Sequence, residues 1–151
     1  MCNWLPVPLD ETACNIDERY GYFRLDFIDH PPTAFDPKSF RIDDAIRDGR
    51  EEAFYHLTTT GGEERKHDPY RCARICWGKP IIQRVDSCDV RTWRRRQNGE
   101  NRVKIALNDF QYLVVLSEES TAVRLVTAFY VHDAKQRGKI KKESERPNED
   151  D

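Results

Sequence analysis

Three strand-like runs separated by short turn sequences fill residues 102–131, and they limit the possible folds more than any other feature. The first run, RVKIAL, alternates Val103, Ile105 and Leu107 with polar or small residues, as a half-buried strand does. FQYLVVL is typical of a buried strand, and AVRLVTAFYV, apolar on both faces, is typical of a central strand. Asn-Asp and SEEST supply turns between the runs. We therefore predict a C-terminal meander of three antiparallel strands.

Two helical segments are predicted shortly before this meander. Asp68 can accept hydrogen bonds at a helix N-cap and Pro69 suits the first helical position, so a helix should run to about Trp77. A glycine and a proline then end or bend it, and the earlier segment REEAFYHL favours a second helix or a turn. For residues 90–96 a helical turn and an exposed strand both stay open. The Asn-Gly pair that follows at 98–99 is a strong turn signal.

The first third of the chain is predicted with a strand and a further helix. Residues 1–18 are typical of an irregular lead-in. Residues 20–28 (YGYFRLDFI) alternate between apolar and polar side chains, which predicts a half-buried strand that could join an edge of the sheet. Prolines then interrupt regular structure, and Ser39 can cap a helix that ends near Gly49.

These elements fit one domain of the α+β class, with N-terminal helices packed on a small antiparallel sheet. A chain of 151 residues that is 38% hydrophobic can bury one modest core, and it contains no internal repeat and no obvious linker. We place the domain at residues 1–142, with an acidic part at 1–64 and a basic part at 65–142. Residues 143–151 (ESERPNEDD) are expected to be a disordered tail.

The sequence shows no sign of a membrane segment, a signal peptide or a cofactor motif. No run of about 18 apolar residues is present, and the short apolar stretch near the N-terminus is interrupted by prolines, so we expect a cytoplasmic protein without membrane partners. Its five cysteines are expected to be reduced and mostly buried. His67, Cys72, Cys76 and Cys88 match no common zinc spacing, so neither metal nor other cofactor is expected.

Charge is distributed unevenly along the chain, although the net charge is only −2. Residues 1–64 contain 6 basic and 14 acidic side chains, a balance of −8, whereas residues 65–104 contain 12 and 4, a balance of +8. A basic segment of this kind is typical of a phosphate-binding surface. The alternative is that the acidic and basic segments face each other within one domain.

RNA is the phosphate-bearing partner that such a segment could also cleave. The sequence lacks the motifs of glycine-rich phosphate loops, serine hydrolases and zinc proteases. RNA carries its own nucleophile in the ribose 2′-hydroxyl. A metal-free ribonuclease therefore needs a base, an acid and cations that stabilise the negative charge developing on the phosphate.

Candidate residues for these roles lie on the predicted helix at 68–77 and on the last strand. Arg71 and Arg74 project from one side of the helix and can bind phosphate, although arginines there are often merely solvated. His67, just before the helix, is the candidate acid or base, with His56 in reserve. Thr127 interrupts an apolar strand, where its hydroxyl could either bind nearby backbone or contact phosphate. Tyr130, three residues on, shares a face with Thr127 only if the strand bulges.

Further basic and aromatic residues could bind the rest of the RNA. Trp93 is the better candidate for stacking on bases, because Trp77 should pack under the helix. The neighbouring arginines could bind phosphate or anchor an acidic partner, including another part of this chain. The predicted substrate-binding set is Trp93, Arg94, Arg95, Arg96, Arg102 and Lys104.

Residues 65–142 also resemble a known group of compact nucleases. The order Arg71-x-x-Arg74-Ile75-x-Trp77, then FQYLVVL, then LVTAFYV with a basic tail, is similar to the phage and polymorphic-toxin branch of the barnase–EndoU–colicin–RelE superfamily. The resemblance implies helices packed on an antiparallel sheet and metal-independent RNA cleavage. It also implies that Arg71 or Arg74 binds phosphate and that Thr127 and Tyr130 line the site. The acidic residues 1–64 have no counterpart in this pattern.

Two functions follow as expectations. The first is a small endoribonuclease of toxin or prophage type that cleaves RNA, with tRNA as one candidate substrate and a cognate immunity or antitoxin protein as a further partner. The second is a non-catalytic binding or inhibitor protein, of the kind that phages encode, which docks nucleic acid or an acidic protein surface through the same basic segment.

Overall fold

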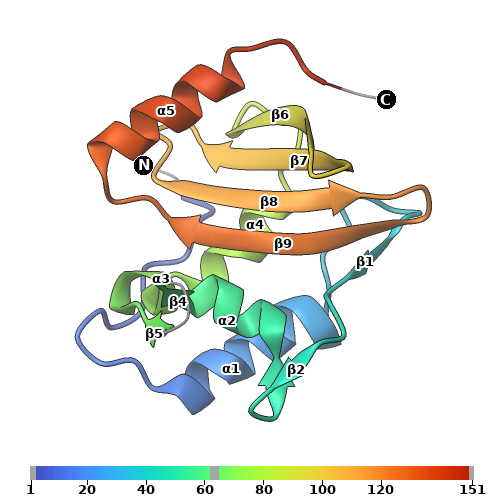
Figure 1. The fold of residues 1–151 in the computed structure, drawn as a ribbon. Coiled ribbons are helices and arrows are strands. Elements are labelled where there is room, and N and C mark those ends of the chain that lie inside the picture. The colour runs from blue at the N-terminus through green and yellow to red at the C-terminus, as the bar shows by residue number, and fades with distance from the viewer. Residues whose placement is uncertain (1–2, 62–64, 150–151) are drawn as a thin grey trace.

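The computed structural model describes residues 3–61 and 65–149, and its centre is a five-stranded sheet in the order β1-β9-β8-β7-β6 (Figure 1). Four of the strands form an antiparallel meander: β6 (Val90–Gln97), β7 (Glu100–Leu107), β8 (Tyr112–Glu118) and β9 (Ala122–Tyr130). The short β1 (Ser39–Arg41) pairs with β9 in parallel. The predicted meander of three strands is thus extended by a fourth, β6, and the sheet is mixed instead of purely antiparallel.

The hairpin between β6 and β7 explains why the undecided segment at 90–97 is a strand. Asn98 and Gly99 both have positive φ, 52° and 74°, as a two-residue hairpin turn of type I′ requires. This turn pairs Gln97 with Glu100, and the ladder then continues back to Val90 opposite Leu107. The Asn98-Gly99 turn therefore determines how β6 and β7 pair.

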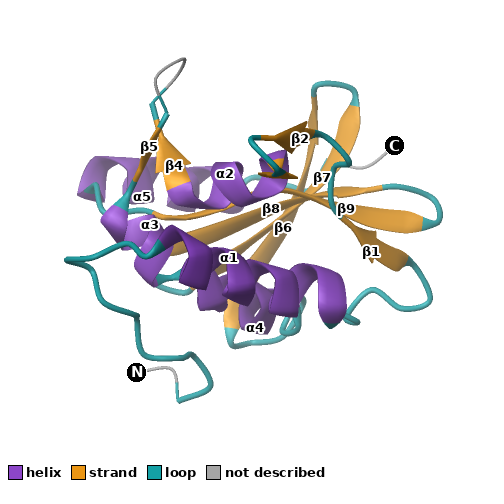
Figure 2. Ribbon diagram, turned by 90° about the horizontal axis from the view of Figure 1, so that it is seen from below, coloured by secondary structure: helices purple, strands orange, loops and turns teal. Residues whose placement is uncertain are grey.

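Helices cover both faces of the sheet (Figures 1 and 2). One face carries α1 (Ile16–Arg24), α2 (Glu52–Thr58), α3 (Pro69–Ala73) and α4 (Gly78–Ile82), together with a π-helical turn at Leu25–Asp29 and a 3-10 turn at Ile75–Trp77. The other face carries α5 (Ala134–Ser144). Two small hairpins, β2 (Ile46–Arg47) with β3 (Arg50–Glu51) and β4 (Thr59–Thr60) with β5 (Lys66–His67), complete the first layer. The α+β class predicted from the sequence is confirmed.

The layers enclose two hydrophobic clusters of unequal size. The larger cluster joins the N-terminal helices to the sheet and includes Phe23, Phe54 and Ile105, each fully buried. The smaller cluster lies between the sheet and α5 and is centred on Trp93. Burial of these side chains is the main favourable contribution to folding, at about 25 cal/mol per Å² of apolar surface.

The strand predicted at residues 20–28 is instead helical. Asn15 caps α1, because its side chain accepts a hydrogen bond from the Glu18 backbone N–H at 3.1 Å. Phe23 and Phe27, four residues apart, share the buried side, whereas Leu25 between them is 47% exposed. The segment alternates with period two in sequence, but the buried Phe23 and Phe27 are four residues apart, a spacing that also fits one side of a helix.

The helix predicted from Ser39 is also wrong, whereas the helix in REEAFYHL is confirmed as α2. Residues 39–41 add β1 to the edge of β9, and Phe40 packs on Phe27 with ring centroids 5.9 Å apart. The helix predicted from Asp68 to about Trp77 starts as expected but ends at Ala73, and a 3-10 turn follows at Ile75–Trp77. Asp68 caps α3 by accepting a hydrogen bond from the backbone N–H of Tyr70 at 2.8 Å. Gly78 and Pro80, which were expected to end or bend this helix, lie inside α4.

Other sequence predictions concern membranes and cysteines. No helix in the described part of the chain is long and apolar enough to cross a lipid bilayer. Cys72 is buried, Cys14 and Cys76 are half-buried and Cys88 is exposed. The expectation of mostly buried thiols is therefore met fully by Cys72, in part by Cys14 and Cys76, and not by Cys88. Cys2 lies outside the described residues.

Candidate functional site

A pocket of about 490 Å³ lies where α2, the end of β4 and α3 meet the middle of β9. This pocket, called the Arg71 pocket below, brings together residues that are far apart in the sequence. Three arginines, one histidine and three threonines dominate its polar lining: Arg65, Arg71, Arg124, His56, Thr59, Thr60 and Thr127. Asp43 is the acidic residue among its described lining, so cationic groups outnumber acidic ones there.

Arg71 is the cation in this pocket that has no carboxylate partner among the described residues. Its Nη1 donates to the Thr59 carbonyl oxygen at 2.9 Å, and its guanidinium lies over the Phe129 ring, 4.9 Å from the centroid. Burial lowers the pKa of Arg71, and the more distant Asp68 offsets this only in part. A half-buried guanidinium that makes one hydrogen bond to the described residues is well suited to bind an anionic ligand.

The other two arginines of the pocket already have acidic partners. Arg65 pairs with Glu52, with Nη1 and Oε2 3.1 Å apart, and Arg124 donates to Glu100. Each can still contribute a positive potential to the pocket, but part of that potential is cancelled by its neighbour. Of the three arginines, Arg71 is the one without such an ion pair among the described residues.

His56 and Thr127 also line the pocket and contact each other. The Thr127 hydroxyl donates to the backbone oxygen of His56 at 3.3 Å, which joins β9 to α2. Burial, and after it the charge of Arg65, lower the pKa of His56 below its usual 6.5. Its imidazole is therefore mainly neutral at pH 7 and able to accept a proton.

The predicted site residues His67, Arg74 and Tyr130 lie outside the Arg71 pocket. His67 is in β5, half-buried against the rings of Phe54 and Tyr55. Burial and the charge of Arg50 lower its pKa, and its buried Nδ1 has no hydrogen-bond partner among residues 3–61 and 65–149. Of the two histidines considered from the sequence, His56 is the one that accompanies Arg71 and Thr127.

Arg74 and Tyr130 form a separate arrangement. The Arg74 guanidinium is buried, lies 4.0 Å from the centroid of the Tyr130 ring and pairs with Glu11 at 2.8 Å. The register shift in β9 falls between the partners of Val115 and Leu116, before Thr127 and not between Thr127 and Tyr130. The bulge that would have brought these two side chains onto one face is therefore absent from the described strand.

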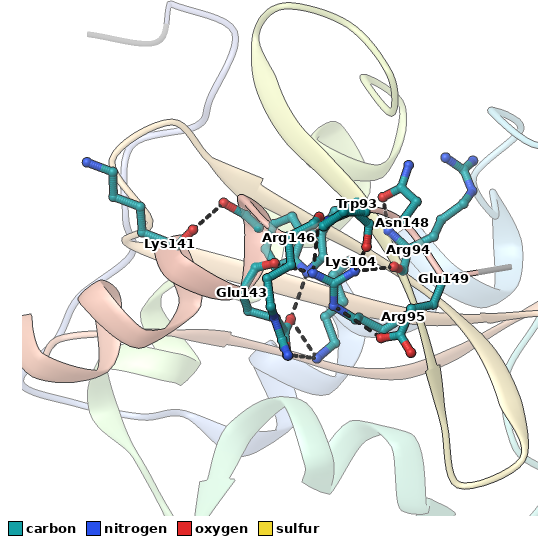
Figure 3. A network of polar contacts seen from close by, with 11 residues as sticks. Trp93, Arg94, Arg95, Lys104, Lys141, Glu143, Arg146, Asn148 and Glu149 are labelled. Carbon is teal, nitrogen blue, oxygen red and sulfur yellow. Dashed lines mark hydrogen bonds and ion pairs between the residues drawn. The ribbon is translucent and has the colours of Figure 1, made fainter.

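Most of the predicted substrate-binding residues are engaged inside the protein (Figure 3). Trp93 is 1% exposed and donates from Nε1 to Glu143 Oε2 at 2.7 Å, so it is not available for stacking on a base. The ammonium group of buried Lys104 donates to both oxygens of the same carboxylate, at 3.1 and 3.0 Å. These contacts attach the end of α5 to β6 and β7.

The arginines at 94 and 95 contact the segment that follows α5, which was expected to be disordered. Arg95 is 3% exposed and donates to the backbone oxygen of Pro147 at 2.7 Å and to that of Glu143. The backbone N–H of Arg94 donates to Asn148 Oδ1 at 2.9 Å, and the Glu149 N–H donates to the Arg94 oxygen at 3.1 Å. Residues 145–149 thus lie along the outer edge of β6. They cover backbone N–H and C=O groups that a free strand edge would expose.

The remaining two cations of the predicted set also have polar partners. Arg102 pairs with Glu100 at 2.8 Å, and Arg96 donates to Asn101 at 2.9 Å. Many cations of the basic segment are therefore neutralised by residues of its own chain. Glu143 and Glu149 at the C-terminal end pair with Lys104 and Arg95, and Glu11 and Glu52 of the acidic first half pair with Arg74 and Arg65. Arg71 and Thr127 are the predicted site residues that the structure places in one pocket.

Comparison with models of protein families, with curated proteins and with solved structures found no match for this chain.

Proposed function

We propose that this protein binds a phosphate group of RNA in the Arg71 pocket and acts as a small metal-independent ribonuclease. The observation that carries the proposal is a half-buried arginine with no carboxylate partner among the described residues, in one pocket with a histidine and a threonine hydroxyl. Helices packed on a largely antiparallel sheet are compatible with the resemblance to barnase–EndoU–colicin–RelE nucleases, and that closer relationship is part of the proposal.

Three residues of the pocket have roles in this chemistry. His56 takes the proton from the ribose 2′-hydroxyl, whose oxygen then attacks phosphorus. The bond from phosphorus to the 5′-oxygen breaks, and that oxygen takes a proton from solvent, leaving a 2′,3′-cyclic phosphate. Arg71 stabilises the additional negative charge on the phosphate oxygens, and Thr127 donates a hydrogen bond to one of them. An acidic immunity or antitoxin protein that covered Arg71 would block all these steps.

The second candidate function, a non-catalytic binding protein, is favoured by the network of Figure 3. A nuclease that grips several phosphates needs several available cations. Arg95 and Lys104, which were predicted to provide them, are buried and paired instead. A pocket with one available arginine is sufficient to bind a single phosphate or carboxylate group of a partner.

Incubation of the purified protein with total RNA in the presence of EDTA tests the proposal directly. We expect fragments with 2′,3′-cyclic phosphate ends, detected by mass spectrometry. Intact RNA at high protein excess would contradict the nuclease. If an uncleavable 2′-O-methyl RNA then still binds in a manner that depends on Arg71, the binding protein is the correct alternative.

Replacing His56 with glutamine should lower the cleavage rate by about 100-fold, because a positioned base contributes roughly 10²–10⁴-fold. Since the pKa of His56 is lowered below 6.5, the base form is already present at pH 7. The rate of the wild type should therefore fall to half its maximum at a pH below 6.5. A pH–rate profile checks this, with exposed His30→Gln as the control; an unchanged rate in the His56 variant would remove its assigned role.

Replacing Thr127 with valine keeps the shape of the side chain and removes its hydroxyl. We expect a loss of about 100-fold in cleavage, the typical effect of removing one donor to the reacting group. The melting temperature should change little, because the contact with His56 is long at 3.3 Å. Thr92→Val is a matched control, since Thr92 also lies in a strand and bonds to backbone outside the pocket. Equal rates for both variants would return Thr127 to a structural role.

A further inference from the structure

An aromatic cluster lies at the C-terminal end of β9, next to the Arg71 pocket. Tyr70, Tyr130 and His132 are in mutual contact, with centroid distances of 5.2 Å for Tyr70–His132, 5.6 Å for Tyr130–His132 and 6.1 Å for Tyr70–Tyr130. Tyr70 is 42% exposed and His132 is exposed as well. Large aromatic rings that remain in water at the surface are a common feature of sites that bind nucleic-acid bases.

The cluster is held rigidly from beneath. Arg74 lies over the Tyr130 ring at 4.0 Å and is itself fixed by Glu11, while Arg137 approaches the Tyr130 hydroxyl at 3.4 Å. Tyr130 and His132 are also nearly parallel, with an interplanar angle of 28°. A preformed stack loses little conformational entropy when another flat ring is added to it.

Two chain connections join this cluster to the Arg71 pocket. Tyr70 precedes Arg71 in α3, and Tyr130 follows Phe129, the ring under the Arg71 guanidinium, in β9. Figure 1 shows α3 below the C-terminal end of β9, with α2 further along the same strand. Tyr70 and Tyr130 of the aromatic cluster therefore come from the same two elements as Arg71 and the ring beneath it, α3 and the C-terminal end of β9.

We propose that Tyr70 and His132 form a stacking subsite for an RNA base whose phosphate occupies the Arg71 pocket. This inference rests on the proposed function and adds a subsite to it. Stacking needs only the flat face of a base, so the subsite should accept purines and pyrimidines with modest preference for the larger ring. The neighbouring cations Arg74 and Arg137 also strengthen the stack, because a guanidinium over an aromatic ring is attracted to its electron-rich face.

Binding of two probes separates the subsite from the phosphate pocket. An uncleavable 2′-O-methyl tetranucleotide offers bases and phosphates, whereas inorganic pyrophosphate offers phosphate alone. We expect Tyr70→Ala and His132→Ala each to weaken tetranucleotide binding about tenfold and to leave pyrophosphate binding unchanged. Tyr70→Trp should retain the wild-type affinity, and Leu25→Ala, which removes a similarly exposed apolar side chain elsewhere, should have no effect.

Isothermal titration calorimetry gives both affinities, and the possible outcomes are distinct. Equal tetranucleotide affinity in wild type, Tyr70→Ala and His132→Ala would overturn the stacking subsite while leaving the pocket intact. If Arg71→Gln leaves the affinity for both probes unchanged, or if neither probe binds, the proposed function is overturned and the subsite with it. Weaker binding of both probes in the Tyr70 variant would indicate a distorted α3 and would also contradict the subsite.

Discussion

Replacing Arg71 with glutamine should lower RNA cleavage by at least about 100-fold, the typical effect of removing one preorganised donor from a reacting centre. Glutamine keeps a polar group that can reach the Thr59 carbonyl oxygen, so the local contact at 2.9 Å can be replaced in part. The positive charge, however, is lost. Since burial already disfavours the charged form of Arg71, the folded protein should tolerate its neutralisation well.

Arg84→Gln is the matched control for this variant. Arg84 also donates to a backbone oxygen, that of Pro80 at 3.2 Å, and also lies over an aromatic ring, Trp4, at 4.2 Å. It differs in having an acidic partner, Asp89, and in lying outside the pocket. The initial rate of cleavage of a fluorescent RNA compares the two variants. Equal loss in both would show that general charge, and not the position of Arg71, determines the rate.

Arg71→Lys refines the same experiment, because it keeps the charge and changes the geometry. A lysine ammonium cannot present two parallel N–H groups to a phosphate, nor can it stack flat on Phe129 as the guanidinium does. We expect its rate to fall between those of the wild type and Arg71→Gln. A lysine variant as active as the wild type would mean that only the charge is needed.

The C-terminal half of the fold could be predicted from the sequence because its signals are local. Alternating side chains at Val103, Ile105 and Leu107 and the Asn98-Gly99 turn each specify a strand or hairpin without reference to distant residues. The segment at 20–28 could not be predicted correctly, because its pattern fits two periods. The Asn15 N-cap favours the helix locally, and packing of Phe23 against Phe54, far along the chain, buries its apolar side.

The site could be predicted only in part, because the sequence shows charges but not their partners. Arg71 and Thr127 were identified from residue type and position, and the structure places them in one pocket. Arg124 was overlooked, although it is a single charge within an apolar strand, and that was a usable signal. From the sequence, Trp93 and Lys104 look free to bind a ligand. In the structure both donate hydrogen bonds to Glu143, which lies 39 positions after Lys104. Ion pairs between residues so far apart leave no local pattern.

Replacing Glu143 with alanine should destabilise the protein by about 2–3 kcal/mol, since it leaves a buried ammonium and a buried indole N–H without their acceptor. Trp93 and Lys104, 1% and 8% exposed, both donate to this carboxylate. For a chain of this size the loss corresponds to a decrease of roughly 5–10 °C in melting temperature. Glu119→Ala, which removes an exposed carboxylate paired with Arg41, should change stability little.

A second substitution distinguishes an unpaired buried charge from a general loss of packing. Adding Lys104→Met to Glu143→Ala removes the buried ammonium and supplies an apolar side chain of similar length. The double variant should therefore be more stable than Glu143→Ala alone, since a buried pair replaced on both sides often costs little. Urea unfolding curves of the four proteins in this cycle measure the coupling. Additive effects would show that Glu143 and Lys104 act independently.

The Glu143 carboxylate should also make the free energy of unfolding depend on pH. Burial alone would raise the pKa of Glu143, but hydrogen bonds from Trp93 and Lys104 and the charges of Lys104 and Arg95 outweigh it and lower the pKa below its usual 4.5. A carboxyl group whose pKa is lower in the folded state than in the unfolded state stabilises the fold fully at a pH above its unfolded-state pKa. This stabilisation is lost as the pH falls through its folded-state pKa. The free energy of unfolding of the wild type should thus decrease below about pH 4.5. In Glu143→Gln that decrease should be shallower, because glutamine does not titrate; an identical acid slope in both proteins would mean that other carboxylates determine it.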